Sequence, residues 1–340
     1  MMSLDQRVGG ARTALSARSR LRGQARTWLS ALLCAGLATS AVSAADSPSF
    51  RFQTNDIIAF VGGEDVVEMQ RNGYLELSLT ADLPHHKLRF RNLAFEGDTV
   101  FEQHRQLNFP SWEKQLERVG ATVVIAQFGQ AESLQGTNGL GRFVEAYERL
   151  LNRFTNGGRR LVLLSPSPIK ATSGLQTDYK MRLGHLKLYT ENISRLAQRR
   201  QDPFVDWIEY FLKLASLGVE WSRDGLHLNT DGHKVAATAV VQELLFRLQN
   251  LGELLDPDPS IELGSEQERL RQLILEKNCL WFDYWRPQNW AFLHGDRTEQ
   301  PSSRDHRDLK KRWFPAEMEK FLPLIETKEK EIWKLAAELK

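Results

Sequence analysis

The chain has 340 residues, of which 41% are hydrophobic and 26% are charged, a composition typical of a globular protein with a substantial buried core. The formal net charge is +2, but residues 1–44 carry six Arg and a single Asp, so the remainder has 39 basic and 42 acidic side chains and a charge of −3. This balance excludes a strongly basic surface, and we expect no nucleic-acid partner.

The first 44 residues have the features of a secretory signal peptide. An Arg-rich segment ends at Arg26, the apolar run Trp28–Ala38 follows, and the small residues Val42-Ser43-Ala44 fit a signal peptidase site. We predict cleavage after Ala44, a secreted or periplasmic protein and no membrane contact after cleavage. An uncleaved N-terminal anchor is the alternative, although the apolar run is short for a membrane span. Cys279 is then the remaining thiol, and we expect it in a core or interface position.

From residue 49 to about residue 255, short apolar segments alternate with amphipathic ones, which predicts βαβ units and a parallel sheet. The predicted strands are Asp56–Val61, Lys87–Asn92, Thr122–Phe128, Arg160–Ser165 and Phe204–Asp206. The predicted helices are Val66–Thr80, Trp112–Val119, Leu140–Phe154, Tyr179–Arg200 and Gly232–Asn250. The expected fold class is therefore α/β, with a five-stranded, mostly parallel sheet between layers of helices.

The Pro/Asp break Asp256–Ser260 marks the expected boundary between an α/β domain, residues 45–255, and a C-terminal extension, residues 256–340. The extension has no strand pattern. Its helical and aromatic patterns cover Glu262–Phe282, Trp281–Phe292 and Ala316–Leu339. We interpret it as an α-helical appendage that packs on the α/β domain through aromatic side chains.

Four polar turns follow predicted strands, and the carboxyl ends of parallel strands meet at one edge of a sheet, where α/β folds bind ligands. The turns are Gly62–Asp65 (GGED), Asn92–Thr99 (NLAFEGDT), Gly129–Ser133 (GQAES) and Ser222–His227 (SRDGLH). In the last turn, Asp224 can hold one imidazole nitrogen of His227 while the other nitrogen faces a reacting group. A structural Asp224–His227 pair that caps the following helix is the alternative.

The order and spacing of these turns resemble the SGNH/GDSL hydrolases, which are secreted esterases with a flavodoxin-like three-layer α/β/α fold. The most specific match is Asp224-Gly225-Leu226-His227, followed by Asn229 and Gly232-His233, and the resemblance covers roughly Asp56 to Leu248. It implies hydrolysis of a small-molecule or carbohydrate ester, with His227 as general base and Asp224 as its orienting partner. We expect no cofactor and no metal.

The first turn departs from the pattern of that family at its central position. Aligned on Gly62-Gly63, Glu64 occupies the place of the family's nucleophilic serine. A carboxylate at this position cannot form an ordinary acyl-serine intermediate. We therefore count Glu64 with His227 and Asp224 as the candidate catalytic residues.

The second and third turns depart from the pattern in their oxyanion-binding positions. Ala94 replaces a glycine whose backbone N–H binds the oxyanion, but alanine keeps that N–H. Ala131 replaces the oxyanion-hole Asn, and loss of one such donor typically costs about 100- to 1000-fold in rate. The residues expected to form the oxyanion hole and the cleft are Gly63, Ala94, Gly97, Asp98, Gly129, Gln130 and Glu132.

Three hypotheses stay open at the level of sequence. The chain is a non-catalytic relative that binds a ligand such as a glycan, or a hydrolase in which Glu64 acts as general base on water with His227. In the second case Asp98 or Glu132 supplies a second carboxylate. In the third, the hydroxyl of Ser133 or Ser165 acts as nucleophile.

A structural protein that binds a partner through its aromatic tail is a further class. Segments of this tail, Arg286–Asn289 and Ser302–His306, resemble the C-terminal helical appendix of large secreted SGNH-like proteins of planctomycete-type bacteria.

Overall fold

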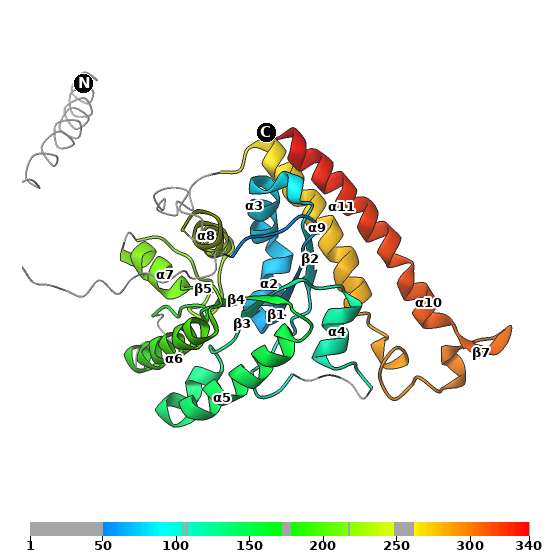
Figure 1. Ribbon diagram of the computed structural model, residues 1–340, viewed down its shortest axis with the longest axis horizontal. Helices are drawn as coiled ribbons and strands as arrows, with labels where there is room; N and C mark the ends of the chain where they lie inside the picture. The colour runs from blue at the N-terminus through cyan, green and yellow to red at the C-terminus, as the bar shows by residue number, and fades with distance from the viewer. Residues whose placement is uncertain are drawn as a thin grey trace, which may run out of the picture. The chain divides into compact units, whose positions relative to one another are not determined.

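Five short strands form the parallel sheet that the sequence predicts. The computed structural model describes residues 50–103, 105, 108–171, 178–216, 218–247 and 262–339. Its main strands are β1 (Ile57–Gly62), β2 (Arg89–Asn92), β3 (Val123–Gln127), β4 (Arg160–Leu164) and β5 (Phe204–Val205), in the spatial order β2-β1-β3-β4-β5. All neighbouring pairs are parallel. The α/β fold class is thereby confirmed (Figure 1).

Helices cover both faces of this sheet because successive strand residues point to opposite faces. Ile58 and Phe60 belong to one core cluster, while Ala59 and Val61 belong to the other. The first cluster is covered by α2 (Glu64–Asn72), α3 (Tyr74–Asp82), α7 (Trp207–Ser216) and α8 (Thr230–Val241). The second is covered by α4 (Trp112–Arg118), α5 (Gly136–Thr155) and α6 (Tyr179–Arg200). Short turns of helix occur at Pro84–His86, Glu132–Gln135 and Gln242–Arg247.

The predicted helix Val66–Thr80 is wrong as a single element, because Gly73 divides it into α2 and α3. Gly73 has φ 72°, a left-handed conformation that favours glycine, and its N–H closes α2 on the carbonyl of Met69 at 2.9 Å. The structure also shows α7, which was not predicted, and it starts α5 four residues before the predicted Leu140.

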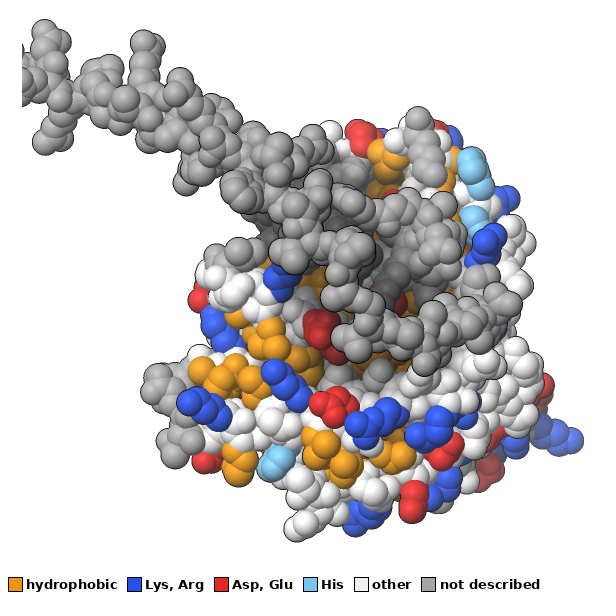
Figure 2. Space-filling view, turned by 60° about the vertical axis from the view of Figure 1, so that its left-hand side comes forward, with side chains coloured by type: hydrophobic (Ala, Val, Ile, Leu, Met, Phe, Trp, Pro, Cys, Tyr) orange, Lys and Arg blue, Asp and Glu red, His pale blue; other side chains and the backbone are white. Residues whose placement is uncertain are grey.

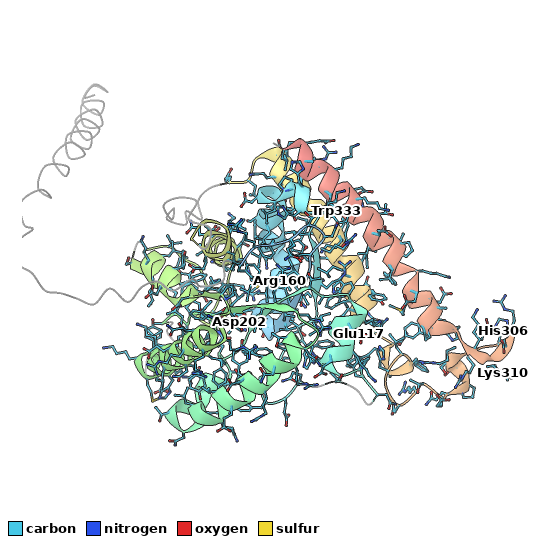
Figure 3. All side chains as sticks on the ribbon, in the orientation of Figure 1. Glu117, Arg160, Asp202, His306, Lys310 and Trp333 are labelled. Carbon is cyan, nitrogen blue, oxygen red and sulfur yellow. The ribbon has the colours of Figure 1, made fainter. Side chains whose placement is uncertain are left out.

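The C-terminal extension is helical at both ends and contains a β-hairpin between them. Its elements are α9 (Ser265–Trp285), 3₁₀ turns at Trp290–Phe292 and Pro301–Ser303, β6 (Arg304–Asp305), β7 (Asp308–Arg312), α10 (Trp313–Glu319) and α11 (Phe321–Glu338). The expectation of no strands here is wrong. The hairpin is polar and β7 is almost fully exposed, so it lacks an alternating apolar pattern. Figure 3 shows His306 and Lys310 at its tip, away from the five-stranded sheet.

Two further expectations concern segments of this region. Cys279 is exposed, so its predicted core position is wrong. The predicted boundary at Asp256–Ser260 and the predicted signal peptide lie outside the described residues.

The outward edge of β2 is covered by side chains of the C-terminal helices rather than by another strand. The indole N–H of Trp333 on α11 donates to the Leu88 carbonyl at 3.0 Å, and that of Trp281 on α9 donates to the Asn92 carbonyl at 2.8 Å. The Phe90 carbonyl between them accepts a hydrogen bond from the Arg91 guanidinium at 2.9 Å. These bonds satisfy edge carbonyls that would otherwise be left open. Figure 3 shows Trp333 on α11, which runs antiparallel to α9 in Figure 1.

Buried polar contacts join α9 to α2 and α3. Lys277 on α9 forms a 2.6 Å ion pair with Glu76 on α3, and the two side chains are 2% and 5% exposed. Gln70 on α2 and Asn278 on α9 exchange two hydrogen bonds, of 3.0 and 2.9 Å, between side chain and backbone. Because each of these groups would be buried without a partner if the other were lost, the C-terminal helices are tied to α2 and α3.

The surface carries mixed charge. On the described part of the face in Figure 2, Lys and Arg side chains are interspersed with Asp and Glu side chains. Within the described ranges, no helix has both the length and the apolar character needed to cross a membrane.

A test of the β2 edge is the substitution Trp281→Phe. Phenylalanine keeps an aromatic ring in the core but removes the donor to the Asn92 carbonyl, so we expect a loss of about 1–3 kcal/mol in the free energy of unfolding. Urea unfolding followed by circular dichroism measures it. Trp313→Phe is the matched control, because Trp313 is 42% exposed and donates to a surface carbonyl. Equal effects of the two substitutions would contradict the role of Trp281 at the edge.

Candidate active site

The turn after β1 places Glu64 at the carboxyl edge of the sheet. Gly62 is required there, because a Cβ on this residue would lie 2.5 Å from the Gln127 carbonyl oxygen and 2.6 Å from a Val66 methyl group. Gly63 then precedes the first residue of α2, which is Glu64. A strand that ends at glycine and leads directly into a helix therefore fixes where the Glu64 side chain starts.

The turn before α8 orients His227. One carboxylate oxygen of Asp224 accepts the backbone N–H groups of Leu226 and His227, both at 2.9 Å. Its other oxygen lies 2.6 Å from Nδ1 of His227. Asn229 caps α8 by accepting the N–H of Gly232 at 2.8 Å. The imidazole is thus held through one nitrogen. The residue that caps α8 is Asn229, and not the Asp224–His227 pair of the alternative interpretation.

The structure brings Glu64 and His227 together. Nε2 of His227 lies 3.3 Å from an Oε atom of Glu64, and the two side chains are 28% and 48% exposed. Asp224, His227 and Glu64 therefore form a line in which each imidazole nitrogen faces a carboxylate.

This arrangement favours the protonated form of His227. Partial burial lowers the pKa of His227, but the hydrogen bond that its imidazole donates to Asp224 and the charges of Glu64, Asp224 and Asp65 outweigh it, so the pKa rises above its ordinary value of 6.5. Burial likewise raises the pKa of Asp224, while its hydrogen bonds to the His227 side chain and backbone lower it more strongly, and the net direction is down. His227 is therefore better placed to donate a proton from Nε2 than to accept one.

A cavity of about 180 Å³ lies beside Glu64. It is lined by Gly63, Glu64, Asp65, Gly97, Asp98, Gln127, Phe128, Gly129, Gln130, Ala131, Glu132, Pro166 and Ser167. Most predicted cleft residues are among these. Ala94 is not, and it is buried with 2% exposure, so the prediction that its N–H faces the cleft is wrong. The reason is local, because the Asn92 side chain accepts the Ala94 N–H at 3.0 Å.

Two further residues of the predicted oxyanion hole, Gly129 and Gln130, have their donors engaged within the protein. The Gly129 N–H donates to a Glu132 carboxylate oxygen at 2.9 Å. The Gln130 side-chain amide donates to the Leu226 carbonyl at 3.2 Å, which ties the third turn to the His227 turn. In the structure as it stands, neither group points a free N–H at a reacting oxygen.

The two carboxylates predicted as partners of Glu64 are also engaged. Glu132 accepts the N–H of Val100 at 2.7 Å as well as that of Gly129, and burial raises its pKa. Asp98 forms a two-pronged ion pair with Arg105, with both distances at 2.7 Å. Burial raises the pKa of Asp98 in spite of this pairing. Through these bonds, both residues hold segments of the cavity wall together.

The hydroxyls considered as alternative nucleophiles are not available either. Ser165 is fully buried, accepts the Trp207 N–H at 2.8 Å and donates to the Pro166 carbonyl. The hydroxyl of Ser133 donates to the Gln130 carbonyl at 2.7 Å. The structure therefore gives no support to a hydroxyl nucleophile at these two positions.

Asp65 is a cavity residue to which sequence reasoning gave no role. Its carboxylate is 7% exposed and hydrogen-bonds with the hydroxyl of Ser167, which also accepts the Gln127 side-chain amide at 3.3 Å. Burial raises the pKa of Asp65 from 3.8 to about 6. An acid placed directly before the apolar pair Val66-Val67, at the buried start of a helix, is the signal that could have pointed to it.

Within the described residues, no group of three or more His, Cys, Asp or Glu side chains has the arrangement of a metal site.

Comparisons with known proteins identify a family and similar folds. The sequence model of the GDSL-like lipase/acylhydrolase family matches residues 58–235, which contain all four turns. No curated protein matches the chain. A gut microbial diltiazem-metabolizing enzyme is 13% identical with a TM-score of 0.54, over 86% of this chain and 96% of that chain. A catalytic mutant of Axe2, an acetylxylan esterase from Geobacillus stearothermophilus, is 17% identical with a TM-score of 0.47, over 58% of this chain and 98% of that one.

The buried acid gives a prediction for stability. Because the folded-state pKa of Asp65 is raised to about 6, the folded protein holds a proton that the unfolded chain releases near pH 4, and stability falls as pH rises from about 4 through 6. Asp65→Asn should remove this loss. We expect the variant to be more stable than wild type by up to about 3 kcal/mol above pH 6 and nearly equal near pH 4.

Denaturant unfolding of both proteins between pH 4 and pH 8 measures the difference. Asp296→Asn is the matched control, because Asp296 is exposed. A constant difference between Asp65→Asn and wild type across this range would show that Asp65 is not a buried, pH-sensitive carboxyl group.

Proposed function

The chain belongs to the GDSL-like lipase/acylhydrolase family, and from this premise we propose that it hydrolyses esters with a water molecule in place of the serine hydroxyl. One observation carries the proposal. Glu64 stands 3.3 Å from Nε2 of His227, at the edge of the cavity, where the serine of the family would stand. A carboxylate there can accept a proton from water, whereas it cannot carry an acyl group through an acyl-serine step.

In this mechanism Glu64 and His227 exchange the roles that a serine triad would give them. Glu64, half exposed, binds a water molecule and removes its proton as the water attacks the ester carbonyl. His227 is held protonated between two carboxylates and donates its Nε2 proton to the departing alcohol. Asp224 keeps the imidazole in place and stabilises its charge.

Stabilisation of the developing oxyanion is the weak step of this mechanism. Ala94, Gly129 and Gln130 have their donors engaged within the protein. The remaining donors beside the cavity are the backbone N–H groups in the first turn of α2, which have no intrahelical partner and carry the positive end of the helix dipole. We therefore propose a slow hydrolase, about 100- to 1000-fold below an enzyme with a complete oxyanion hole.

The cavity limits the substrate class. Its volume of about 180 Å³ is below the range of roughly 300–1,000 Å³ that encloses a drug-sized ligand. We propose that it takes a small acyl group, with the alcohol, for example a carbohydrate, outside the cavity. Export, predicted from residues 1–44, is part of this proposal.

The pH dependence of hydrolysis separates this mechanism from a serine mechanism. If His227 acts as an acid, the rate on an alkyl ester such as ethyl acetate, whose alkoxide must be protonated as it leaves, falls as pH rises through the His227 pKa, which lies above 6.5. A serine triad needs neutral histidine and gains rate over the same range. We expect the falling limb in wild type, and a loss of at least about 100-fold in His227→Ala.

Glu64→Ser tests the same point from the other side. The variant places a hydroxyl opposite Nε2, so His227 becomes the base and the rate should rise with pH, with a burst of p-nitrophenol from p-nitrophenyl acetate as the acyl-enzyme forms. Glu68→Ser, one turn further along α2, is the matched control and should keep the wild-type profile. Wild-type protein that is folded and shows only the background rate would refute the proposed hydrolysis.

A second function, ligand binding without turnover, is favoured by one observation. The N–H groups of Ala94 and Gly129 are satisfied inside the protein, as expected of a cleft that no longer stabilises a tetrahedral intermediate. Carboxylates and amides in the cavity lining, such as Asp65 and Gln130, are suitable partners for sugar hydroxyls.

This second function predicts ligand-induced thermal stabilisation on a panel of neutral glycans. The shift in melting temperature should decrease in Glu64→Ala and remain in Glu68→Ala. If no glycan raises the melting temperature of wild type, the binding function is excluded for that class of ligand.

A further inference from the structure

Two arginines contact a phenylalanine ring in the loop that follows β2. The ring of Phe95 contacts the guanidinium groups of Arg105 and Arg286, whose central carbons are 3.9 and 4.1 Å from the ring centroid. Trp290 stacks on the same ring, with centroids 5.9 Å apart. Arg286 and Trp290 belong to the C-terminal extension. Two cation–π contacts and a stacked indole thus hold the Phe95 side chain in place.

The next residue, Glu96, connects Arg286 to α2, the helix that begins at Glu64. Its carboxylate accepts a hydrogen bond from Arg286 at 2.6 Å and another from Arg71 at 3.3 Å. Arg71 is in the last turn of α2 and also pairs with Glu68. Glu96 therefore joins the end of α9 to the end of α2.

Two residues further on, the loop touches the turn before Glu64. A Cβ on Gly63 would lie 3.3 Å from the Asp98 carbonyl oxygen, which is tighter than ordinary van der Waals contact. The Asp98 side chain is held by Arg105, the residue that also covers Phe95. A shift of this loop therefore presses on Gly63 or leaves it unsupported.

We infer that Arg286 is a positioning residue for the candidate site, because it holds loop 93–99 against Gly63 and so sets the position of Glu64 relative to His227. The contacts of Arg286 are at the molecular surface, where its side chain is 21% exposed and that of Glu96 is 37% exposed. A surface ion pair of this kind contributes little to global stability. Its effect therefore appears in the geometry of the cavity wall rather than in the melting temperature.

The His227 imidazole reports the distance to Glu64 without any need for activity. The full chain is labelled with ¹⁵N-histidine, and the signal of His227, one of eight histidines, is assigned by its loss in His227→Gln. Asp224, Glu64 and Asp65 are the charged groups that influence this ring. Glu64→Ala sets the scale, because it removes one of these charges and should lower the His227 pKa.

In Arg286→Ala, we expect the His227 pKa to fall by at least about half of the change seen in Glu64→Ala. Phe95→Leu, which keeps apolar volume but removes the ring, should shift it in the same direction. Arg269→Ala is the matched control, because Arg269 pairs only with Glu266 on its own helix, and it should leave the His227 pKa unchanged. Melting temperatures of all variants show whether each is folded.

The outcomes distinguish this inference from the proposed hydrolysis. If Arg286→Ala and Phe95→Leu are folded and keep the wild-type His227 pKa while Glu64→Ala lowers it, the positioning role is refuted. If Glu64→Ala itself leaves the His227 pKa unchanged, the Glu64–His227 contact does not exist in solution, which refutes both. A lack of esterase activity does not bear on this result.

Discussion

The open edge of β2 is the constraint on which the rest of the molecule depends. A parallel sheet must be covered on both faces, and an edge strand must also satisfy its outward backbone groups. Here the indoles of Trp281 and Trp333 bind two edge carbonyls, and Lys277 enters the core to pair with Glu76. The C-terminal helices that supply these groups contribute to both core clusters. They therefore complete the sheet and, through α2 and the loop after β2, reach the edge at which Glu64 and His227 meet.

At that edge, the charges around His227 determine whether its imidazole is suited to donate or to accept a proton. In a serine triad, Nε2 faces a hydroxyl, and the imidazole must be neutral to take its proton. Here Nε2 faces the carboxylate of Glu64 while Nδ1 faces that of Asp224, and the pKa of His227 is raised. This arrangement favours a protonated imidazole, which is the state that the proposed mechanism uses as an acid.

The sequence predicts the parts of this structure that depend on periodicity and on sheet topology. All five strands are found, and four of them are short, largely apolar runs between turn residues, as expected of buried parallel strands. Glu64 follows β1 directly, at the carboxyl edge of the sheet, whereas His227, 163 positions further on, follows α7 and reaches the same edge through the turn before α8. The features that the sequence does not predict are local hydrogen bonds and backbone conformations. The Asn92 side chain takes the Ala94 N–H, and Gly73 splits a helix through one left-handed residue. The polar hairpin β6–β7 lacks the alternating apolar pattern from which a strand can be predicted.

Asp65 shows most clearly that the cavity is more than a remnant of packing. A carboxyl group that is 7% exposed, with its pKa raised to about 6, costs stability at neutral pH. An asparagine could keep the bond to Ser167 without that penalty. Buried acids with raised pKa values cluster at functional sites, where a proton must be held or released near neutral pH. Asp65 lies beside Glu64 in the cavity lining, and its charge raises the His227 pKa. In the proposed mechanism, the charged form of Asp65 therefore favours the protonated His227 that donates from Nε2.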